Sequence, residues 1–332
     1  MTQIDSPTIT VIVCTRNRPA LLEQCLGALS RQTYPRFDVL VVDNASMRPV
    51  QDICRRWGAT WALAPLTGLT RARNIGARLA QGELIAYIDD DAVAEAGWLE
   101  ALVEDFKDPE IAAVTGRIRY MKSQGDSRAI SNEEANDDKA RARNRFDQVT
   151  SHWFALACFG GIGDGGNMAF RRNLIVSVQA FDERLGRGNL VDGGDEHALF
   201  ASMIARGYRI SHNPEAIVRH PSPSTPELQR ARKICDLRSS IAYLMFTWRE
   251  FPAHRAEILR FLFRAVLKRI VAVVARPSAA MQLSRWQALR AMFGGVVVYW
   301  RASREWEGTQ DTIRQEVNTP VPEHIKPRAA AH

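Results

Sequence analysis

The stretch Glu83-Leu84-Ile85-Ala86-Tyr87-Ile88-Asp89-Asp90-Asp91 joins an apolar run to three consecutive carboxylates. The apolar run has the length and composition of a short buried strand, and the acids follow where that strand ends. Adjacent carboxylates at the edge of a core are costly, because each one raises the pKa of the next. A bound Mg²⁺ would remove this cost, since it takes carboxylate and phosphate oxygens as ligands. The stretch therefore indicates a metal site, and the alternative at this point is a plain acidic loop.

Upstream of the acids, strand and helix patterns alternate. Apolar and β-branched runs predict strands, and apolar residues at helical spacing predict helices. The predicted strands cover 8–13, 37–42 and 60–63, and the predicted helices cover 20–32, 51–57 and 70–80. We expect Gly82 to cap the last of these helices. This alternation predicts an α/β fold with a mostly parallel sheet, whose ligands bind beyond the carboxyl ends of the strands.

Downstream, the same patterns predict a helix at 98–106 and a strand at 112–119. The charged segment 121–150 is short of apolar residues, and it is either a lid or a solvated insertion. The glycine-rich stretch 160–172 predicts tight turns or a close approach of the backbone to a ligand. It does not fit the pattern of a P-loop.

Two later motifs carry titratable groups. Asp195 and Glu196 follow Gly193-Gly194 and begin a predicted helix that ends before Gly207. Acids at the start of a helix are stabilised by its macrodipole, which is a purely structural role. Equally, one of these acids can act as a general base held over a pocket. His220 ends a short predicted strand at 217–221, where a single histidine is either structural or a ligand.

The composition excludes several classes of protein. A chain of 332 residues with 46% hydrophobic and 24% charged residues is ordinary for a folded soluble protein. The five cysteines show no paired spacing, which indicates reduced thiols in a cytosolic setting. The first residues lack a signal-peptide pattern. No zinc-finger, helix-turn-helix or RNA-binding motif accompanies the net charge of +7, so we expect no nucleic-acid partner.

The basic character belongs to the C-terminal third, which holds 18 Lys and Arg against 9 Asp and Glu from Glu227 onward. An apolar helix predicted at 253–275 carries Arg255, Arg260, Arg264 and Lys268 on one face. Such a helix is typical of binding to an anionic membrane surface, and packing on the rest of the protein is an equal alternative. The uncharged run 291–300 is too short to span a bilayer, which needs about 20 apolar residues. We expect 318–332 to be a disordered tail.

Taken in order, these motifs resemble those of the family 2 inverting glycosyltransferases, which use nucleotide-sugar donors on a GT-A fold. The resemblance covers roughly residues 8–222. The matching segments are Thr15-Arg16-Asn17-Arg18, Val41–Ser46, Gly68–Gly76, Asp89-Asp90-Asp91, Gly166–Arg171, Gly194-Asp195-Glu196 and His220.

The resemblance implies a role for each matched residue. The donor-binding residues would be Thr15, Arg16, Asp43, Arg73, Asn74, Asp89 and Asp90. Asp43 would contact the base, and a uracil is favoured by the family's habit. Asp91 and His220 would bind Mg²⁺ or Mn²⁺ on the diphosphate. Gly165, Gly166 and Asn167 would shape the acceptor site.

The acidic pair departs from the family pattern, in which Glu precedes Asp and the second acid is the general base. Here the order is Asp195-Glu196. By position Glu196 inherits the base role, and Asp195 is the second candidate. Ala198 stands where the family often has an acid, so the acceptor contacts can differ.

These observations predict a GT-A catalytic domain at 1–226, a basic helical extension at 227–317 that either associates with membrane or packs on the catalytic domain, and a disordered tail at 318–332. The expected activity is metal-dependent, inverting transfer of a sugar to a glycan or lipid-linked acceptor, in the synthesis of cell-surface polysaccharide or glycolipid. The expected location is the cytoplasm or the inner face of the cell membrane. The alternatives are a nucleotidyltransferase acting on sugar phosphates and an inactive GT-A domain that serves as a membrane-bound scaffold.

Overall fold

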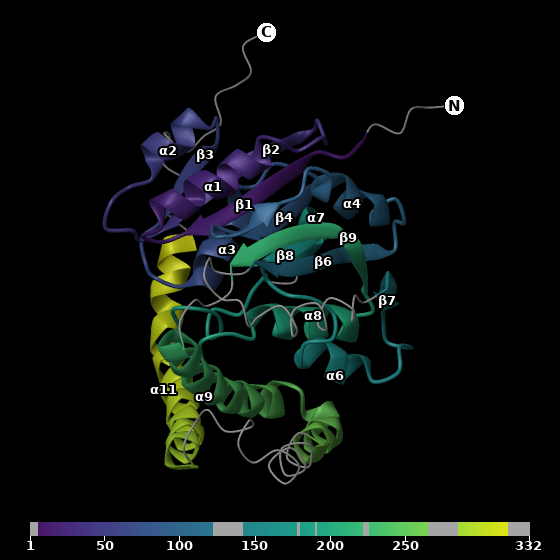
Figure 1. The fold of residues 1–332 in the computed structure, drawn as a ribbon. Helices are drawn as coiled ribbons and strands as arrows, with labels where there is room; N and C mark the ends of the chain where they lie inside the picture. Colours follow the sequence, from purple (N-terminus) through teal and green to yellow (C-terminus); the bar gives the residue numbers. More distant parts are fainter. Residues whose placement is uncertain are drawn as a thin grey trace.

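A central sheet with helices on both faces forms the body of the protein in a computed structural model (Figure 1). The structure describes residues 6–121, 142–177, 180–189, 191–221, 226–264 and 285–317. The strands are β1 (Ile9–Thr15), β2 (Phe37–Asn44), β3 (Thr60–Ala64), β4 (Leu84–Asp89), β5 (Val93–Ala94), β6 (Ile111–Met121), β7 (Asn144–Phe146), β8 (Asn167–Arg171) and β9 (Arg209–Pro221).

The helices of the body are α1 (Pro19–Leu29), α2 (Gln51–Arg56), α3 (Leu69–Leu79), α4 (Trp98–Asp105), α6 (Trp153–Cys158), α7 (Arg172–Ser177) and α8 (Asp195–Ala205). The strands lie in the order β3-β2-β1-β4-β8-β6-β9-β5, and β7 pairs with β9. The pairs among β1, β2, β3 and β4 are parallel, as is β6 with β9. The predicted α/β class with a mostly parallel sheet is therefore confirmed.

The parallel strands are buried on both faces, which is why they read as continuous apolar runs. One core cluster lies between the sheet and α1 and α4, around Leu22, Leu26 and Trp98. A second lies between the sheet and α3, α6 and α8, around Tyr87, Phe170 and Phe200. Strands β1, β4, β6 and β9 run in the same direction, because β8 is antiparallel to both β4 and β6. The carboxyl ends of β1, β4 and β9 therefore lie at the same edge of the sheet.

The glycine-rich stretch 160–172 ends in β8, an antiparallel strand between β4 and β6 that the sequence analysis did not predict. One expectation about a helix end is corrected. Gly82 is not a left-handed helix cap, since its φ angle is not positive. It instead lies against β1, where a Cβ atom would stand 2.5 Å from the Thr10 amide nitrogen.

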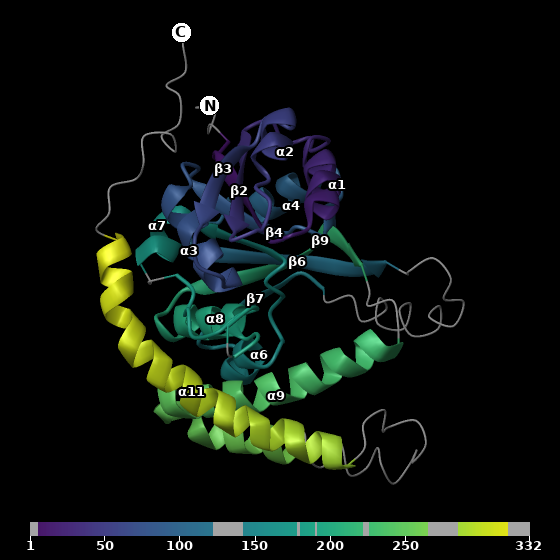
Figure 2. The same cartoon turned by 90° about the vertical axis from the view of Figure 1, so that its left-hand side faces the viewer.

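The C-terminal helices α9 (Pro226–Glu250) and α11 (Arg285–Val317) pack along one another below α6 and α8 (Figure 2). A third apolar cluster joins them to the body, in which Tyr243 and Tyr299 pack with Leu185 and Ala198. The helix expected at 253–275 is present over 255–264, and the rest of it lies outside the described residues. So do the tail 318–332 and most of the segment 121–150. No helix within the described ranges is both long and apolar enough to cross a bilayer.

Candidate active site

The three acids lie at the end of β4 and in the turn that follows it, at the edge of the sheet. Asp90 is buried and accepts a hydrogen bond of 2.7 Å from the Thr15 hydroxyl at the end of β1. Arg18 donates to Asp90 at 3.1 Å and to Asp91 at 3.0 Å. The turn is thus braced by residues that the first strand delivers.

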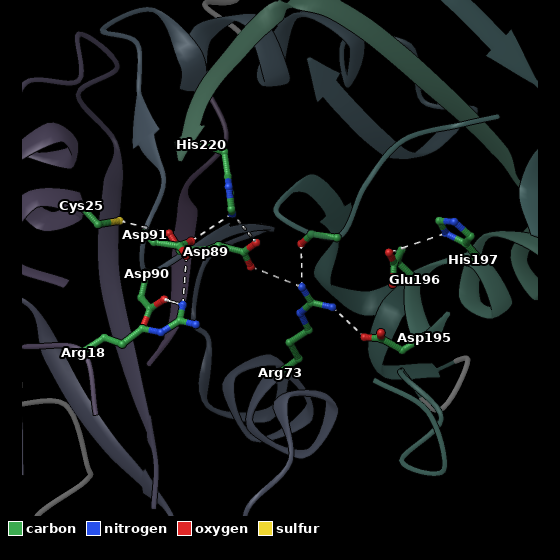
Figure 3. A network of polar contacts seen from close by, with 11 residues as sticks. Arg18, Cys25, Arg73, Asp89, Asp90, Asp91, Asp195, Glu196, His197 and His220 are labelled. Carbon is green, nitrogen blue, oxygen red and sulfur yellow. Dashed lines mark hydrogen bonds and ion pairs between the residues drawn. The ribbon is translucent and has the colours of Figure 1, made fainter. Parts of the chain in front are cut away.

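Asp89 and Asp91 converge with His220, which β9 brings to the same place (Figure 3). His220 Nε2 lies 3.0 Å from Asp91 Oδ1 and 3.7 Å from Asp89 Oδ2. On the other side of the ring, Nδ1 donates to the Pro221 carbonyl at 3.0 Å, which directs Nε2 toward the acids. One donor atom from each residue fits within 4.8 Å of the others, so the cluster has the size of a cation site.

The attraction between His220 and the two aspartates shifts the pKa values of all three groups. Burial acts to lower the pKa of His220, but hydrogen bonds to Asp89 and Asp91 outweigh it and raise that pKa to about 10. Burial acts to raise the pKa of Asp89 and of Asp91, yet the bonds from His220 leave both below the ordinary value. The two carboxylates are therefore ionised, and the imidazolium holds the place where a cation would neutralise them.

Arg73 connects the acidic turn to the second acidic pair. Its side chain is buried on α3 and donates from Nη1 to Asp195 Oδ2 at 2.6 Å. Its Nη2 donates to the Gly165 carbonyl at 2.9 Å and lies 3.6 Å from Asp89 Oδ1. One guanidinium therefore spans three segments that are distant in sequence.

Asp195 and Glu196 stand at the first turn of α8 but differ in environment. Asp195 is almost fully buried, whereas the Glu196 side chain keeps 17% of its surface and lies 3.7 Å from His197 Nδ1. Burial raises the pKa of Asp195 to about 7, opposed by Arg73 and reinforced by the Glu196 charge. Burial also acts to raise the pKa of Glu196, but the charges of His197 and Arg73 outweigh it and lower that pKa. Glu196 is thus the acid of the pair that stays ionised at neutral pH.

A cavity of about 430 Å³ joins all of these groups, which is within the range of small-molecule sites. Most of the sequence-predicted site residues line it, namely Thr15, Arg16, Arg73, Asp89, Asp90, Asp91, Gly165, Gly166, Asp195, Glu196 and His220. Glycine is required at positions 165 and 166, because charged side chains lie too close to the backbone there to leave room for a Cβ atom. A Cβ on Gly165 would stand 2.8 Å from Arg73 Nη2, and one on Gly166 would stand 2.5 Å from Asp89 Oδ2.

Three expected site residues lie behind the cavity wall instead. Asp43 accepts a hydrogen bond from the Ser46 amide at 2.9 Å and so holds the turn after β2. Asn74 pairs with the backbone of Phe181 through both its amide nitrogen and its oxygen. Asn167 is fully buried, and its amide bonds Trp98 and the carbonyls of Arg117 and Ala216. These side chains support the site through the segments that they fix.

The sequence reasoning missed other groups at the cavity, namely Arg18, Tyr120, Asp164, Arg187 and Arg232. Arg18 lay within a quoted motif and carried a usable signal, since a basic residue after the first strand faces the acidic turn in a parallel sheet. Arg187 and Arg232 carried no local signal. They reach the cavity only through the packing of the loop before α8 and of α9.

Comparison with known proteins finds similar chains among the glycosyltransferases. The model of the family described as glycosyl transferase family 2 matches residues 10–175. The glycosyltransferase AglE of Haloferax volcanii is 25% identical over 231 residues, covering 67% of this chain and 69% of that protein. An N-acetylglucosaminyltransferase of Rhizobium meliloti is 28% identical over 237 residues, covering 66% of this chain and 52% of that protein. The chain thus spans about half the length of the latter relative.

Two solved structures share the fold. The mannosyltransferase PcManGT from Pyrobaculum calidifontis, in complex with GDP-Man and Mn²⁺, aligns with a TM-score of 0.57 at 22% identity, covering 95% of this chain and 87% of that one. Residues 1–349 of S. aureus TarS in complex with UDP-GlcNAc align with a TM-score of 0.54 at 15% identity, covering 91% and 92%. The fold is that of the GT-A nucleotide-sugar transferases. Because the family model covers half of its length, this chain belongs to glycosyl transferase family 2.

Proposed function

We propose that this chain is a metal-dependent inverting glycosyltransferase that moves a sugar from a nucleoside-diphosphate sugar to a hydroxyl of a glycan or lipid-linked acceptor. One observation carries the proposal. The Asp89, Asp91 and His220 cluster and the Asp195–Glu196 pair line one cavity, with Arg73 between them. A donor-activating site and a base must share a cavity for a single transfer step.

The residues of the cluster suit Mg²⁺ or Mn²⁺. Carboxylate oxygens are the ligands that these hard cations prefer, and the imidazole of His220 would supply a third ligand. A bound cation would supply positive charge that stabilises the departing diphosphate. The complex of PcManGT with GDP-Man and Mn²⁺ supports this assignment.

On the donor side, Thr15, Arg16, Arg73, Asp89 and Asp90 all line the cavity, and we assign direct contacts to Arg16, Arg73 and Asp89. Thr15 and Asp90 hold each other and shape the donor loop, as Asp43 and Asn74 do from behind the wall. A uridine nucleotide is favoured because several relatives are named N-acetylglucosaminyltransferases, and TarS was solved with UDP-GlcNAc. A guanosine nucleotide is the alternative, after the complex with GDP-Man.

Glu196 is the proposed general base. Its carboxylate is ionised and partly exposed at the cavity, where it can take the proton of the acceptor hydroxyl as that oxygen attacks the anomeric carbon. Asp195 instead holds Arg73 at 2.6 Å and positions it. The swapped order of the two acids therefore leaves the base role with the second one.

The acceptor would bind against the backbone of Gly165 and Gly166, which lies between Arg73 and Asp89. A glycan or lipid-linked acceptor is supported by two further relatives. One is a glucosyl-dolichyl phosphate glucuronosyltransferase of Haloferax volcanii, and the other is an O-antigen biosynthesis protein of Myxococcus xanthus. We place the reaction in the synthesis of cell-surface polysaccharide or glycolipid.

The same proposal includes binding at the cytoplasmic face of a membrane. Helix α11 exposes Trp286, Phe293 and Trp300, with 78%, 73% and 55% of their surfaces accessible. These residues recur every seventh position and so share one helix face, and the segment 285–304 contains four arginines and no acid. Flotation with liposomes of anionic lipid tests this binding. Replacement of the three aromatic residues by serine should abolish it at low salt, and equal flotation of both proteins would contradict it.

The proposed activity is tested by incubating the protein and Mn²⁺ with a panel of nucleotide sugars that includes UDP-GlcNAc and GDP-Man, and identifying the phosphorus-containing product. A glycosyltransferase releases a nucleoside diphosphate. A nucleotidyltransferase would release no nucleoside diphosphate from these substrates, but it would release inorganic diphosphate when given a nucleoside triphosphate and a sugar 1-phosphate. An inactive scaffold would release neither product in either assay. Either of the last two results would overturn the proposal.

A further inference from the structure

Two arginines at the cavity, Arg187 and Arg232, have neither a carboxylate partner among the described residues nor a role assigned above. Arg18 and Arg73 are occupied by carboxylates of the site. Arg187 and Arg232 line the same cavity and are exposed, and among the described residues no carboxylate forms an ion pair with either. An unpaired guanidinium in a cavity is well suited to a phosphate, which it can bind through two parallel hydrogen bonds.

A rigid turn presents Arg187. The glycines on either side of it adopt left-handed conformations, with φ of 99° at Gly186 and 84° at Gly188. The Arg187 carbonyl accepts a hydrogen bond of 2.9 Å from the amide of Leu69, at the start of α3. One residue later, the Thr70 hydroxyl donates to the Leu185 carbonyl at 2.5 Å. The turn is therefore fixed to the helix that also carries Arg73.

Arg232 comes from α9, which belongs to the C-terminal third of the chain. Three residues further along α9, Cys235 lies 3.1 Å from an oxygen of Asp192, in the loop before α8. Two turns beyond that, the Tyr243 ring packs so tightly on Gly194 that a Cβ there would stand 2.5 Å from it. Helix α9 thus runs beneath α8 (Figure 2), and its Arg232 lines the cavity.

Tyr120 lies beside the candidate cation site and lines the same cavity as both arginines. Its ring centroid lies 5.9 Å from that of His220. The two guanidiniums and the Asp89, Asp91 and His220 cluster therefore border one cavity.

We propose that Arg187 and Arg232 form a subsite for the terminal phosphate of the donor's diphosphate, so that α9 completes the active site. The inference rests on the proposed function. In the transfer, the bond between the anomeric carbon and the oxygen of that phosphate breaks, and its electron pair stays on the phosphate. The acceptor oxygen forms the new bond and gives its proton to Glu196. The two arginines stabilise the charge that accumulates on the leaving group.

The test compares the binding of UDP and GDP with that of UMP and GMP, by calorimetry in the presence of Mn²⁺. We expect Arg187→Ala and Arg232→Ala each to weaken binding of the preferred diphosphate about 10-fold, the loss of one charge-assisted hydrogen-bonding group. Binding of the monophosphate, which lacks the terminal phosphate, should stay unchanged. Arg232→Lys should recover part of the loss, because the charge remains.

Arg249→Ala is the matched control, since Arg249 is exposed on the same helix and does not line the cavity. It should bind both nucleotides like the wild type. The inference is overturned if the alanine variants retain diphosphate affinity, or if they lose monophosphate affinity equally. It is also overturned if only the KM for the acceptor changes, which would assign the subsite to an acceptor phosphate. A wild-type protein that binds no nucleoside diphosphate would instead refute the proposed function.

Discussion

At the scale of single residues, the site depends on charges that are paired before any substrate arrives. Arg73 is buried and pairs with Asp195, while its other nitrogen contacts Gly165 and approaches Asp89. A buried ion pair of this kind is costly to break, because removal of one partner leaves an uncompensated charge. The guanidinium therefore fixes the distance between the acidic turn and α8, and with it the distance between leaving group and base.

Substitution of the two acids of α8 should change kcat and donor affinity in different ways. Glu196→Gln removes the proposed base, so we expect kcat to fall about 100- to 10,000-fold, with little change in donor affinity. Asp195→Asn weakens the pairing of Arg73, so we expect a loss of donor affinity in addition to a loss of kcat. Steady-state kinetics with nucleotide-binding measurements distinguish the two patterns. If Asp195→Asn alone abolished kcat and Glu196→Gln retained it, the base assignment would have to be reversed.

Binding of the metal should depend on pH through His220. The folded-state pKa of about 10 lies above the ordinary value of 6.5, so the imidazolium is favourable at low pH, and this contribution is lost as the pH rises through about 10. A cation requires the neutral ring and displaces one proton. The affinity for Mn²⁺ should therefore rise about tenfold per pH unit between pH 6 and 8.

Calorimetry in buffers of different ionisation enthalpy measures both the affinity and the proton release. The variant His220→Asn should bind Mn²⁺ more weakly and with a flatter pH dependence. An affinity in the wild type that does not change between pH 6 and 8 would exclude His220 as a ligand.

At the scale of elements, the sequence predicted most strands and helices of the first half, because each buried parallel strand is a continuous apolar run. It missed β8, since the glycines before Asn167 dominate the local pattern and the strand is identified only by its partners β4 and β6. It placed Asn167 in the acceptor site, although burial directs that side chain to Trp98 and two carbonyls. Local pattern identifies an element, but it does not say which neighbours will surround a polar side chain.

The close packing of α9 on α11 can be tested by substituting two adjacent glycines of α11, Gly294 and Gly295. A Cβ on Gly295 would stand 2.4 Å from the Arg238 carbonyl oxygen of α9, whereas one on Gly294 would meet nothing closer than 3.6 Å. We expect Gly295→Ala to destabilise the protein by about 1–3 kcal/mol through overpacking. Gly294→Ala should stabilise it by up to about 1 kcal/mol, because alanine is the better helix former. Urea unfolding measures both, and equal effects would contradict the close crossing of the two helices.

At the scale of the whole molecule, the order of the motifs predicted the fold and the family, but it did not predict how the halves of the site meet. Asp91 and His220 were correctly placed at strand ends, and they converge because β4 and β9 end at the same edge of the sheet. The pairing of Arg73 with Asp195 spans 122 residues, and no local spacing encodes it. The contribution of α9 to the cavity was likewise invisible in the sequence, because it depends on packing between Tyr243 and the turn at Gly194.

The central claim is that a cation held by Asp91, Asp89 and His220 activates a nucleotide sugar in the cavity shared with Glu196. The most direct measurement is the rate of nucleoside diphosphate release from the preferred nucleotide sugar, with and without Mn²⁺, in the wild type and in Asp91→Ala. The account predicts release that requires Mn²⁺ in the wild type and falls at least about 100-fold in the variant. Mn²⁺-dependent release at the wild-type rate in Asp91→Ala would contradict it.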